Sequence, residues 1–112
     1  MGNKNKESIK GRTLNLAELA KYQKGIVVSK EIINKNTGTV TVFSFDKGEG
    51  LSEHVAPFDA MVYILDGKVR VEIGGKPNIV SKGEFIILPA GKPHALYSIT
   101  KWKMLLVMIR AK

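Results

Sequence analysis

Cysteine is absent from this chain of 112 residues, which excludes disulfide bonds, thiolate metal sites and thiol nucleophiles. Any metal must therefore be held by histidine, carboxylate, backbone or water. Long apolar runs are also missing, since no stretch approaches the roughly 18 residues that can span a bilayer. The first twelve residues are polar and charged, with no apolar segment behind them, so we expect no membrane contact and a cytoplasmic protein.

Acidic residues are few, with 10 Asp and Glu against 18 Lys and Arg, and the net charge is +8. The first twelve residues carry +3 of this charge, and the other basic residues occur mostly singly. A clustered basic and aromatic surface is missing, so we do not expect a nucleic-acid partner, although the charge would favour an anionic small molecule. We interpret residues 1–12 as a disordered basic tail and residues 13–112 as one domain.

Helical patterning occurs once, from Asn15 to Tyr22. There Asn15 is a candidate N-cap with Glu18 three residues later, and a short helix is predicted. After this segment the pattern becomes extended, and eight short strands are predicted. These strands are "IVVSKEII" (26–33), "TVTVFSF" (39–45), "AMVYIL" (60–65), "VRVEI" (69–73), "PNIV" (77–80), "GEFIILP" (83–89), "HALYSI" (94–99) and "WKMLLVMI" (102–109). Close turn signals between them predict an all-β, antiparallel sandwich or barrel.

The last predicted strand has apolar residues on both faces. One face carries Leu105, Val107 and Ile109. The other carries Trp102, Met104, Leu106 and Met108. A one-core domain cannot bury both faces of a strand unless something covers the second. The N-terminal segment or another subunit could do so, and we favour a homodimer.

Only two histidines are present, His54 and His94, and their surroundings follow two spaced patterns. The first pattern is Gly, five residues, His, one residue, His, three or four residues, Glu, six residues, Gly; the second is Gly, five residues, Pro, one residue, Gly, two residues, His, three residues, Asn. Matching positions of the first are Gly48, His54 and Gly67, and of the second Gly83, Pro89, Gly91 and His94, with Ser98 in place of Asn. In these motifs the chain resembles the cupin superfamily, in the manner of a small single-domain cupin.

The resemblance implies a jelly-roll barrel, also called a double-stranded β-helix, in which three histidines and one carboxylate hold a metal. Here Ala56 and Ala60 occupy two of those four positions, so the metal site is degenerate. His54 and His94 remain as ligands for a divalent metal such as zinc, nickel, iron or copper, yet two imidazoles alone do not complete such a site. Asp59 is a further ligand candidate if a bulge turns it inward; otherwise it caps a backbone N–H or pairs with a lysine.

The two alanines favour a larger and more apolar cavity with His54 and His94 as polar anchors. Met61, Met104 and Met108 could line this cavity or fill the core. We therefore interpret the chain as a small-molecule-binding cupin whose pocket includes His54, Ala56, Ala60 and His94. The alternatives are a metal-dependent oxygenase or isomerase with an incomplete site, a metal-free acid/base catalyst, or two structural histidines. The motifs assign no catalytic residue and no particular ligand.

Overall fold

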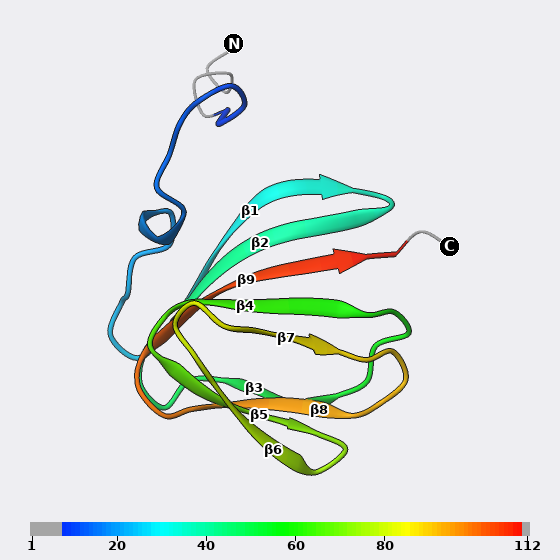
Figure 1. The fold of residues 1–112 in the computed structure, drawn as a ribbon. Helices are drawn as coiled ribbons and strands as arrows, with labels where there is room; N and C mark the ends of the chain where they lie inside the picture. The colour runs from blue at the N-terminus through cyan, green and yellow to red at the C-terminus, as the bar shows by residue number, and fades with distance from the viewer. Residues whose placement is uncertain (1–7, 111–112) are drawn as a thin grey trace.

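Nine strands make up most of the computed structural model, which describes residues 8–110 (Figure 1). The elements, in chain order, are the 3-10 turn η2 (Leu16–Glu18) and the strands β1 (Val27–Lys35), β2 (Gly38–Phe45), β3 (Leu51–His54), β4 (Ala60–Asp66), β5 (Lys68–Ile73), β6 (Lys76–Ser81), β7 (Phe85–Leu88), β8 (His94–Ser98) and β9 (Trp102–Ile109). The eight predicted strands are present. β3 is an additional strand, which the sequence pattern did not predict.

The strands form two antiparallel sheets. One sheet has five strands in the order β1-β2-β9-β4-β7, and the other has four in the order β3-β8-β5-β6. The chain crosses between the sheets repeatedly, so neighbours in each sheet are mostly far apart in sequence (Figure 1). This arrangement confirms the predicted antiparallel jelly-roll fold. Within residues 8–110, no helix is long and apolar enough to cross a membrane.

An aromatic stack lies in the core at one end of the barrel. The rings of Phe45 on β2 and Trp102 on β9 are parallel to within 4°, with their centroids 3.9 Å apart, and both side chains are fully buried. The indole N–H of Trp102 donates a hydrogen bond to the Glu49 carbonyl oxygen at 3.2 Å. Large buried side chains of this kind each contribute on the order of 2 kcal/mol to stability through apolar burial. The stack therefore fixes β2 against β9 at this end.

Gly67 joins β4 to β5 at a place where only glycine fits. Its φ is +80°, and a Cβ atom there would lie 2.1 Å from the carbonyl oxygen of Lys101. A side chain at this position would collide with backbone, which cannot move without disturbing the start of β9. Gly67, the last glycine of the first motif, therefore allows the β4–β5 turn to lie against the backbone of Lys101.

The N-terminal segment contains less helix than predicted. Only Leu16–Glu18 forms a 3-10 turn, and the Asn15 side chain makes no capping hydrogen bond. The carbonyl oxygen of Ala17 accepts a hydrogen bond from Lys103 Nζ at 2.6 Å, and that of Lys21 accepts one from the Ser44 hydroxyl at 3.0 Å. Carbonyl groups that a longer helix would use are therefore bound to the sheet, and these tertiary contacts override the local helix signal.

Three side-chain interactions of Tyr22 hold the same segment at the C-terminal end of β4. The Tyr22 hydroxyl donates to Asp66 Oδ2 at 2.7 Å, and Lys101 and Lys103 lie over its ring. Burial raises the pKa of Tyr22, and the hydrogen bond to Asp66 raises it further. Of the predicted disordered tail, residues 1–7 lie outside the described residues, whereas residues 8–12 form a turn in which Arg12 N–H donates to the Ile9 carbonyl.

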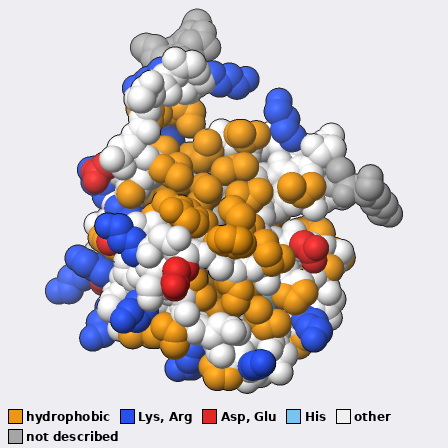
Figure 2. Space-filling view, viewed as in Figure 1, with side chains coloured by type: hydrophobic (Ala, Val, Ile, Leu, Met, Phe, Trp, Pro, Cys, Tyr) orange, Lys and Arg blue, Asp and Glu red, His pale blue; other side chains and the backbone are white. Residues whose placement is uncertain are grey.

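Beyond this segment the outer face of the five-stranded sheet is hydrophobic. Figure 2 shows apolar side chains gathered over its strands on the viewed side of the molecule. Exposed members include Ile33, Phe85, Ile87 and Ile109. The N-terminal segment therefore covers only one end of the face, and the predicted homodimer stays a prediction.

Candidate functional site

The two histidines lie opposite each other on paired strands. His54 ends β3, His94 begins β8, and the two are direct partners in the β3–β8 ladder. The backbone between Leu51 and His54 is irregular relative to β8, so the register shifts there. The strand that the sequence pattern did not predict is thus the one that brings the two motifs together.

Their rings contact each other through the same nitrogen. The two Nε2 atoms are 3.0 Å apart, and the ring planes meet edge to face at 76°. Each Nδ1 is engaged by a carbonyl oxygen: Ser52 O lies 2.8 Å from Nδ1 of His54, and Lys92 O lies 3.2 Å from Nδ1 of His94. Because a carbonyl oxygen can only accept, each Nδ1 carries a hydrogen, and each Nε2 is directed toward the other ring.

The environments of the two rings differ. His94 is only 3% exposed, whereas His54 is exposed to solvent. Burial lowers the pKa of His94 below its usual 6.5, the charge of His54 lowers it further, and the Lys92 carbonyl acts in the opposite direction. Burial therefore disfavours a charged ring at His94.

A cavity of about 50 Å³ lies behind the pair, inside the barrel. It is lined by Leu51, His54, Ala56, Ala60, Val62, Leu88, His94, Leu96, Met104, Leu106 and Met108. The structure thus brings together His54, Ala56, Ala60 and His94, and the wall is apolar apart from the imidazoles. The cavity is smaller than the sequence led us to expect, and Met104, Leu106 and Met108 of β9 are among its lining residues.

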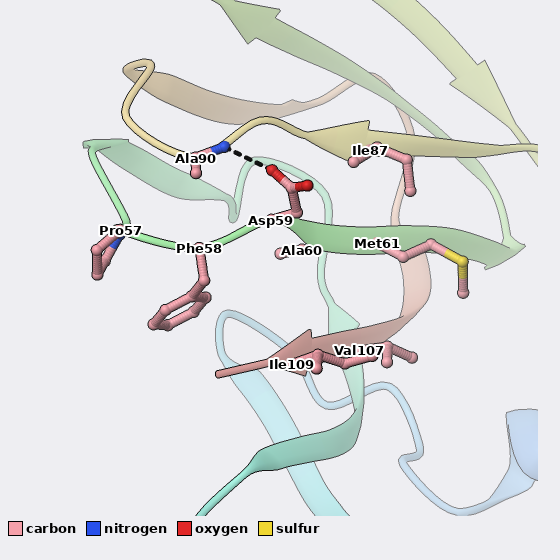
Figure 3. A pocket seen from close by; sticks show the side chains of 9 residues that line it. All are labelled: Pro57, Phe58, Asp59, Ala60, Met61, Ile87, Ala90, Val107 and Ile109. Atoms are coloured by element: carbon pink, nitrogen blue, oxygen red, sulfur yellow. Dashed lines mark hydrogen bonds between the residues drawn. The ribbon is translucent and has the colours of Figure 1, made fainter. Parts of the chain in front are cut away.

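Asp59 lies on the other side of the sheet. Its Oδ1 accepts a hydrogen bond from the Ala90 N–H at 2.8 Å, and its side chain lines a groove outside the barrel (Figure 3). Met61 lines the same groove, whereas Met104 and Met108 line the inner cavity. The structure therefore does not bring Asp59 to the histidines; it gives this carboxylate the backbone-capping contact that was the alternative.

The donor set does not fit the metal that the resemblance implies. Two Nε2 atoms 3.0 Å apart could belong to one coordination sphere. Zinc and iron sites in proteins, however, normally use at least three protein ligands, and residues 8–110 contain no group of three His, Asp or Glu side chains placed to hold one ion. The positions that would complete the set are methyl groups, so the chain supplies only half of the expected ligands.

The groups that orient the two imidazole rings were not predicted from the sequence. Ser52 and Lys92 each lie two residues before a histidine and present a backbone carbonyl, with no contribution from their side chains. Every residue has a backbone carbonyl, so the residue type does not indicate which carbonyl will bind a ring. The shared offset of two residues between the carbonyl and the ring is the only signal, and it is visible only once both contacts are known.

A small antiparallel jelly-roll barrel with a histidine pair at the mouth of its cavity defines the class of protein. The family model described as "Cupin domain" matches residues 41–110, and the chain belongs to this family. That model covers both histidines and all seven glycine, proline and histidine positions of the two motifs.

Several solved structures are similar to this chain. A conserved protein of unknown function from Streptococcus pyogenes is 34% identical, with a TM-score of 0.86 over 91% of this chain and 90% of its own. A cupin 2 conserved barrel domain protein from Leptotrichia buccalis is 46% identical, with a TM-score of 0.82 over 86% of this chain, which spans only 47% of that one. A cupin superfamily protein from Desulfitobacterium hafniense is 25% identical, with a TM-score of 0.85 over 91% of this chain and 94% of its own. No curated protein matches the chain.

Proposed function

We propose that this cupin binds a small organic anion, a short carboxylate, whose head group accepts a hydrogen bond from the Nε2–H of the His54–His94 pair. The observation that carries the proposal is the convergence of the two Nε2 atoms at 3.0 Å in front of an apolar cavity. A polar pair at the mouth of an apolar space is the general form of a small-molecule site.

The hydrogen-bonding pattern indicates the charge of the ligand. With both Nδ1 atoms donating to carbonyls, two neutral rings would direct two lone pairs at each other across 3.0 Å. The contact is favourable only when one Nε2 carries a hydrogen, which gives the pair one positive charge. A carboxylate complements that charge, and the net charge of +8 favours the approach of anions.

The cavity limits the size of the apolar part. A volume of about 50 Å³ accommodates roughly one to two groups the size of a water molecule. The ligand therefore places a methyl- or ethyl-sized end inside, beside Ala56 and Ala60, and any larger part lies outside, near the exposed His54.

Proton NMR of the two imidazoles tests the proposal, because only two histidines contribute signals in this region. We expect saturable shifts of both rings with formate, acetate, propionate and butyrate, and much weaker shifts with the matching alcohols. A charge-assisted hydrogen bond is worth about 1.5–3 kcal/mol, so His54→Ala should weaken carboxylate binding about tenfold or more. If neither ring responds to any carboxylate near neutral pH, the proposal is wrong.

Ser52→Ala is the matched control. It removes the exposed hydroxyl beside His54 but keeps the carbonyl oxygen that fixes the ring. Carboxylate affinity should be unchanged in this variant. An equal loss in Ser52→Ala and His54→Ala would show that the loop conformation, and not the imidazole, determines binding.

Metal-free acid/base catalysis is the second candidate function. Two imidazoles in contact, one exposed and one buried, can take up and deliver a proton near neutral pH. Turnover of a carboxylate that binds, lost in both His54→Ala and His94→Gln, would favour this candidate. Binding without chemical change of the ligand, followed by NMR over time, would favour the binding protein.

A further inference from the structure

The turn that carries His94 has few backbone groups with which to hold its shape. Residues 89–93 follow β7 and precede His94, the first residue of β8. Pro89 and Pro93 stand at the two ends of this turn, and proline has no backbone N–H. Three backbone donors therefore remain in the turn, on residues 90–92.

Two of these three donors bind the segment 56–59. The Ala90 N–H donates to Asp59 Oδ1 at 2.8 Å, and the Gly91 N–H donates to the Ala56 carbonyl oxygen at 2.8 Å. The third donates at 3.4 Å to a carbonyl within the turn itself. Asp59 is thus the one side chain that accepts a hydrogen bond from the backbone of this turn.

Strand pairing explains why a side chain takes this place. β4 and β7 pair Ala60 with Leu88, so continuation of the register places Asp59 opposite Pro89. Pro89 cannot donate to a ladder, and the next donor, the Ala90 N–H, is bound by the carboxylate (Figure 3). The Asp59 side chain therefore extends the contact between the two strands beyond the end of their ladder.

The same turn presents the carbonyl group that orients His94. The Lys92 oxygen lies 3.2 Å from Nδ1 of His94, two residues after the amide that Asp59 binds. In a neutral imidazole, the hydrogen bond made by one nitrogen determines which nitrogen carries the hydrogen. A turn held in place by Asp59 therefore keeps the hydrogen of His94 on Nδ1 and leaves Nε2 directed at His54.

His54 is oriented by a different part of the chain. The Ser52 carbonyl oxygen lies 2.8 Å from its Nδ1, and both residues belong to β3. The turn at residues 89–93 makes no contribution to this contact. A change at Asp59 should consequently act on His94, with the Nδ1 of His54 as an internal reference.

We propose that Asp59 is a positioning residue for His94, acting from outside the barrel through the turn at residues 89–93. Without this carboxylate, the Lys92 carbonyl is released from Nδ1, and His94 can carry its hydrogen on Nε2 instead. That hydrogen satisfies Nε2 of His54 without a positive charge on the pair, so a carboxylate binds more weakly. The effect on binding rests on the proposed function, whereas the effect on the His94 ring does not.

Proton–nitrogen NMR correlation of the imidazoles tests the proposal, because the chain contains only two histidines. Near neutral pH and without ligand, the share of His94 that carries its hydrogen on Nε2 should rise in Asp59→Ala, while the Nδ1 signal of His54 stays unchanged. Asp59→Asn keeps an acceptor for the Ala90 N–H, so its spectrum should resemble that of wild type. An unchanged His94 tautomer in Asp59→Ala would overturn the proposal.

Titration with acetate measures the effect on the site. The affinity should fall about fivefold in Asp59→Ala, the order of magnitude of one lost hydrogen bond, and should be kept in Asp59→Asn. Both variants remove a negative charge, which by itself would favour an anion, so charge does not explain a loss confined to the alanine variant. If wild type binds no carboxylate but the His94 tautomer still changes in Asp59→Ala, the proposed function is wrong and the role of Asp59 stands.

Glu84→Ala is the matched control. Glu84 Oε1 accepts a hydrogen bond from the Ser81 N–H at 2.8 Å, in an exposed turn at the opposite end of β7. This variant should leave the His94 tautomer and acetate affinity unchanged, and changes equal to those in Asp59→Ala would overturn the proposal. Circular dichroism checks the fold. If Asp59→Ala does not fold, Asp59→Leu, which is close to asparagine in size but has no acceptor, should shift the tautomer in the same direction.

Discussion

The five-stranded sheet has apolar side chains on both faces, but the two faces hold very different spaces. Inside the barrel, the cavity behind His54 and His94 measures only about 50 Å³. Outside, the groove beside Met61 and Ile87 measures about 590 Å³ and is open. Adjacent residues of β4 serve the two sides, since Ala60 reaches the cavity and Met61 projects into the groove.

The inner and outer faces of the sheet therefore use hydrophobic residues differently. On the inner face, apolar side chains pack together with one small gap and two imidazoles, which suits selection of a small polar group. On the outer face the same residue types remain partly exposed, which suits contact with a large surface. The two faces of one sheet thus differ in kind, because one encloses a small cavity and the other presents an open apolar groove.

Replacing one methionine on each face by alanine should give the largest difference in unfolding free energy between the two faces. Met104 is fully buried inside, so Met104→Ala should lower the free energy of unfolding by about 2–5 kcal/mol. Met61 is half-buried on the outer face, so Met61→Ala should cost about 1 kcal/mol or less. Urea denaturation of the two variants and of the unaltered protein measures both losses. Equal losses would contradict the distinction between a packed inner face and an open outer face.

Restoring the two absent ligand types on the inner face should have an intermediate effect. In Ala56→His with Ala60→Glu, we expect metal-free protein to lose about 1–3 kcal/mol, because larger side chains enter a small cavity. Zinc or nickel should then bind at one ion per chain and recover the loss. Calorimetric titration and metal analysis of tag-free protein measure both effects.

Ala56→His alone is the control for that double variant, and it should bind the metal more weakly than the double variant. Metal binding by the unaltered protein would contradict our interpretation of the site. If it binds zinc, nickel, iron or copper at one ion per chain, and His54→Ala abolishes that binding, then our interpretation of the donor set as unfit is wrong.

Acidification should produce the smallest effect, and only the inner face has a histidine to respond. The pKa of His94 in the folded state lies below 6.5, because burial disfavours the charged ring. The unfolded chain therefore takes up a proton first, and stability should fall as the pH drops through about 6.5, then level off below the folded pKa. The difference in unfolding free energy between wild type and His94→Gln, measured from pH 8 to pH 5, should follow this curve. A difference independent of pH would contradict the cause assigned to the pKa of His94.

Periodicity and motif spacing predicted most of the fold. The alternation in Val69–Ile73 and the run Trp102–Ile109 formed the strands expected of them. The segment Asn15–Tyr22 departed from prediction, because Lys103 and Ser44 bind its carbonyl groups from strands far along the chain. Local sequence does not contain information on such contacts.

The site was predictable in its residues but not in its geometry. The resemblance to the cupin motifs implied that His54 and His94 line one cavity, and the structure brings them together. Two backbone carbonyls orient the rings for their Nε2 contact, and Met104 and Met108 are among the side chains whose packing bounds the cavity. Neither the ring contact nor the volume can be derived from residue order, so the sequence predicted the lining residues but not the small size of the cavity.

The position of β9 has a consequence for how the chain acquires its structure. β9 follows every other strand in the sequence, yet it pairs with both β2 and β4 in the middle of the five-stranded sheet. Until it is synthesised, β2 and β4 present open edges, and the aromatic partner of Phe45 is missing. Closure therefore depends on contacts distant in sequence, which form slowly and leave nascent edges open to other chains. Ribosome-bound chains that end before Trp102 should consequently be sensitive to protease and bound by chaperones.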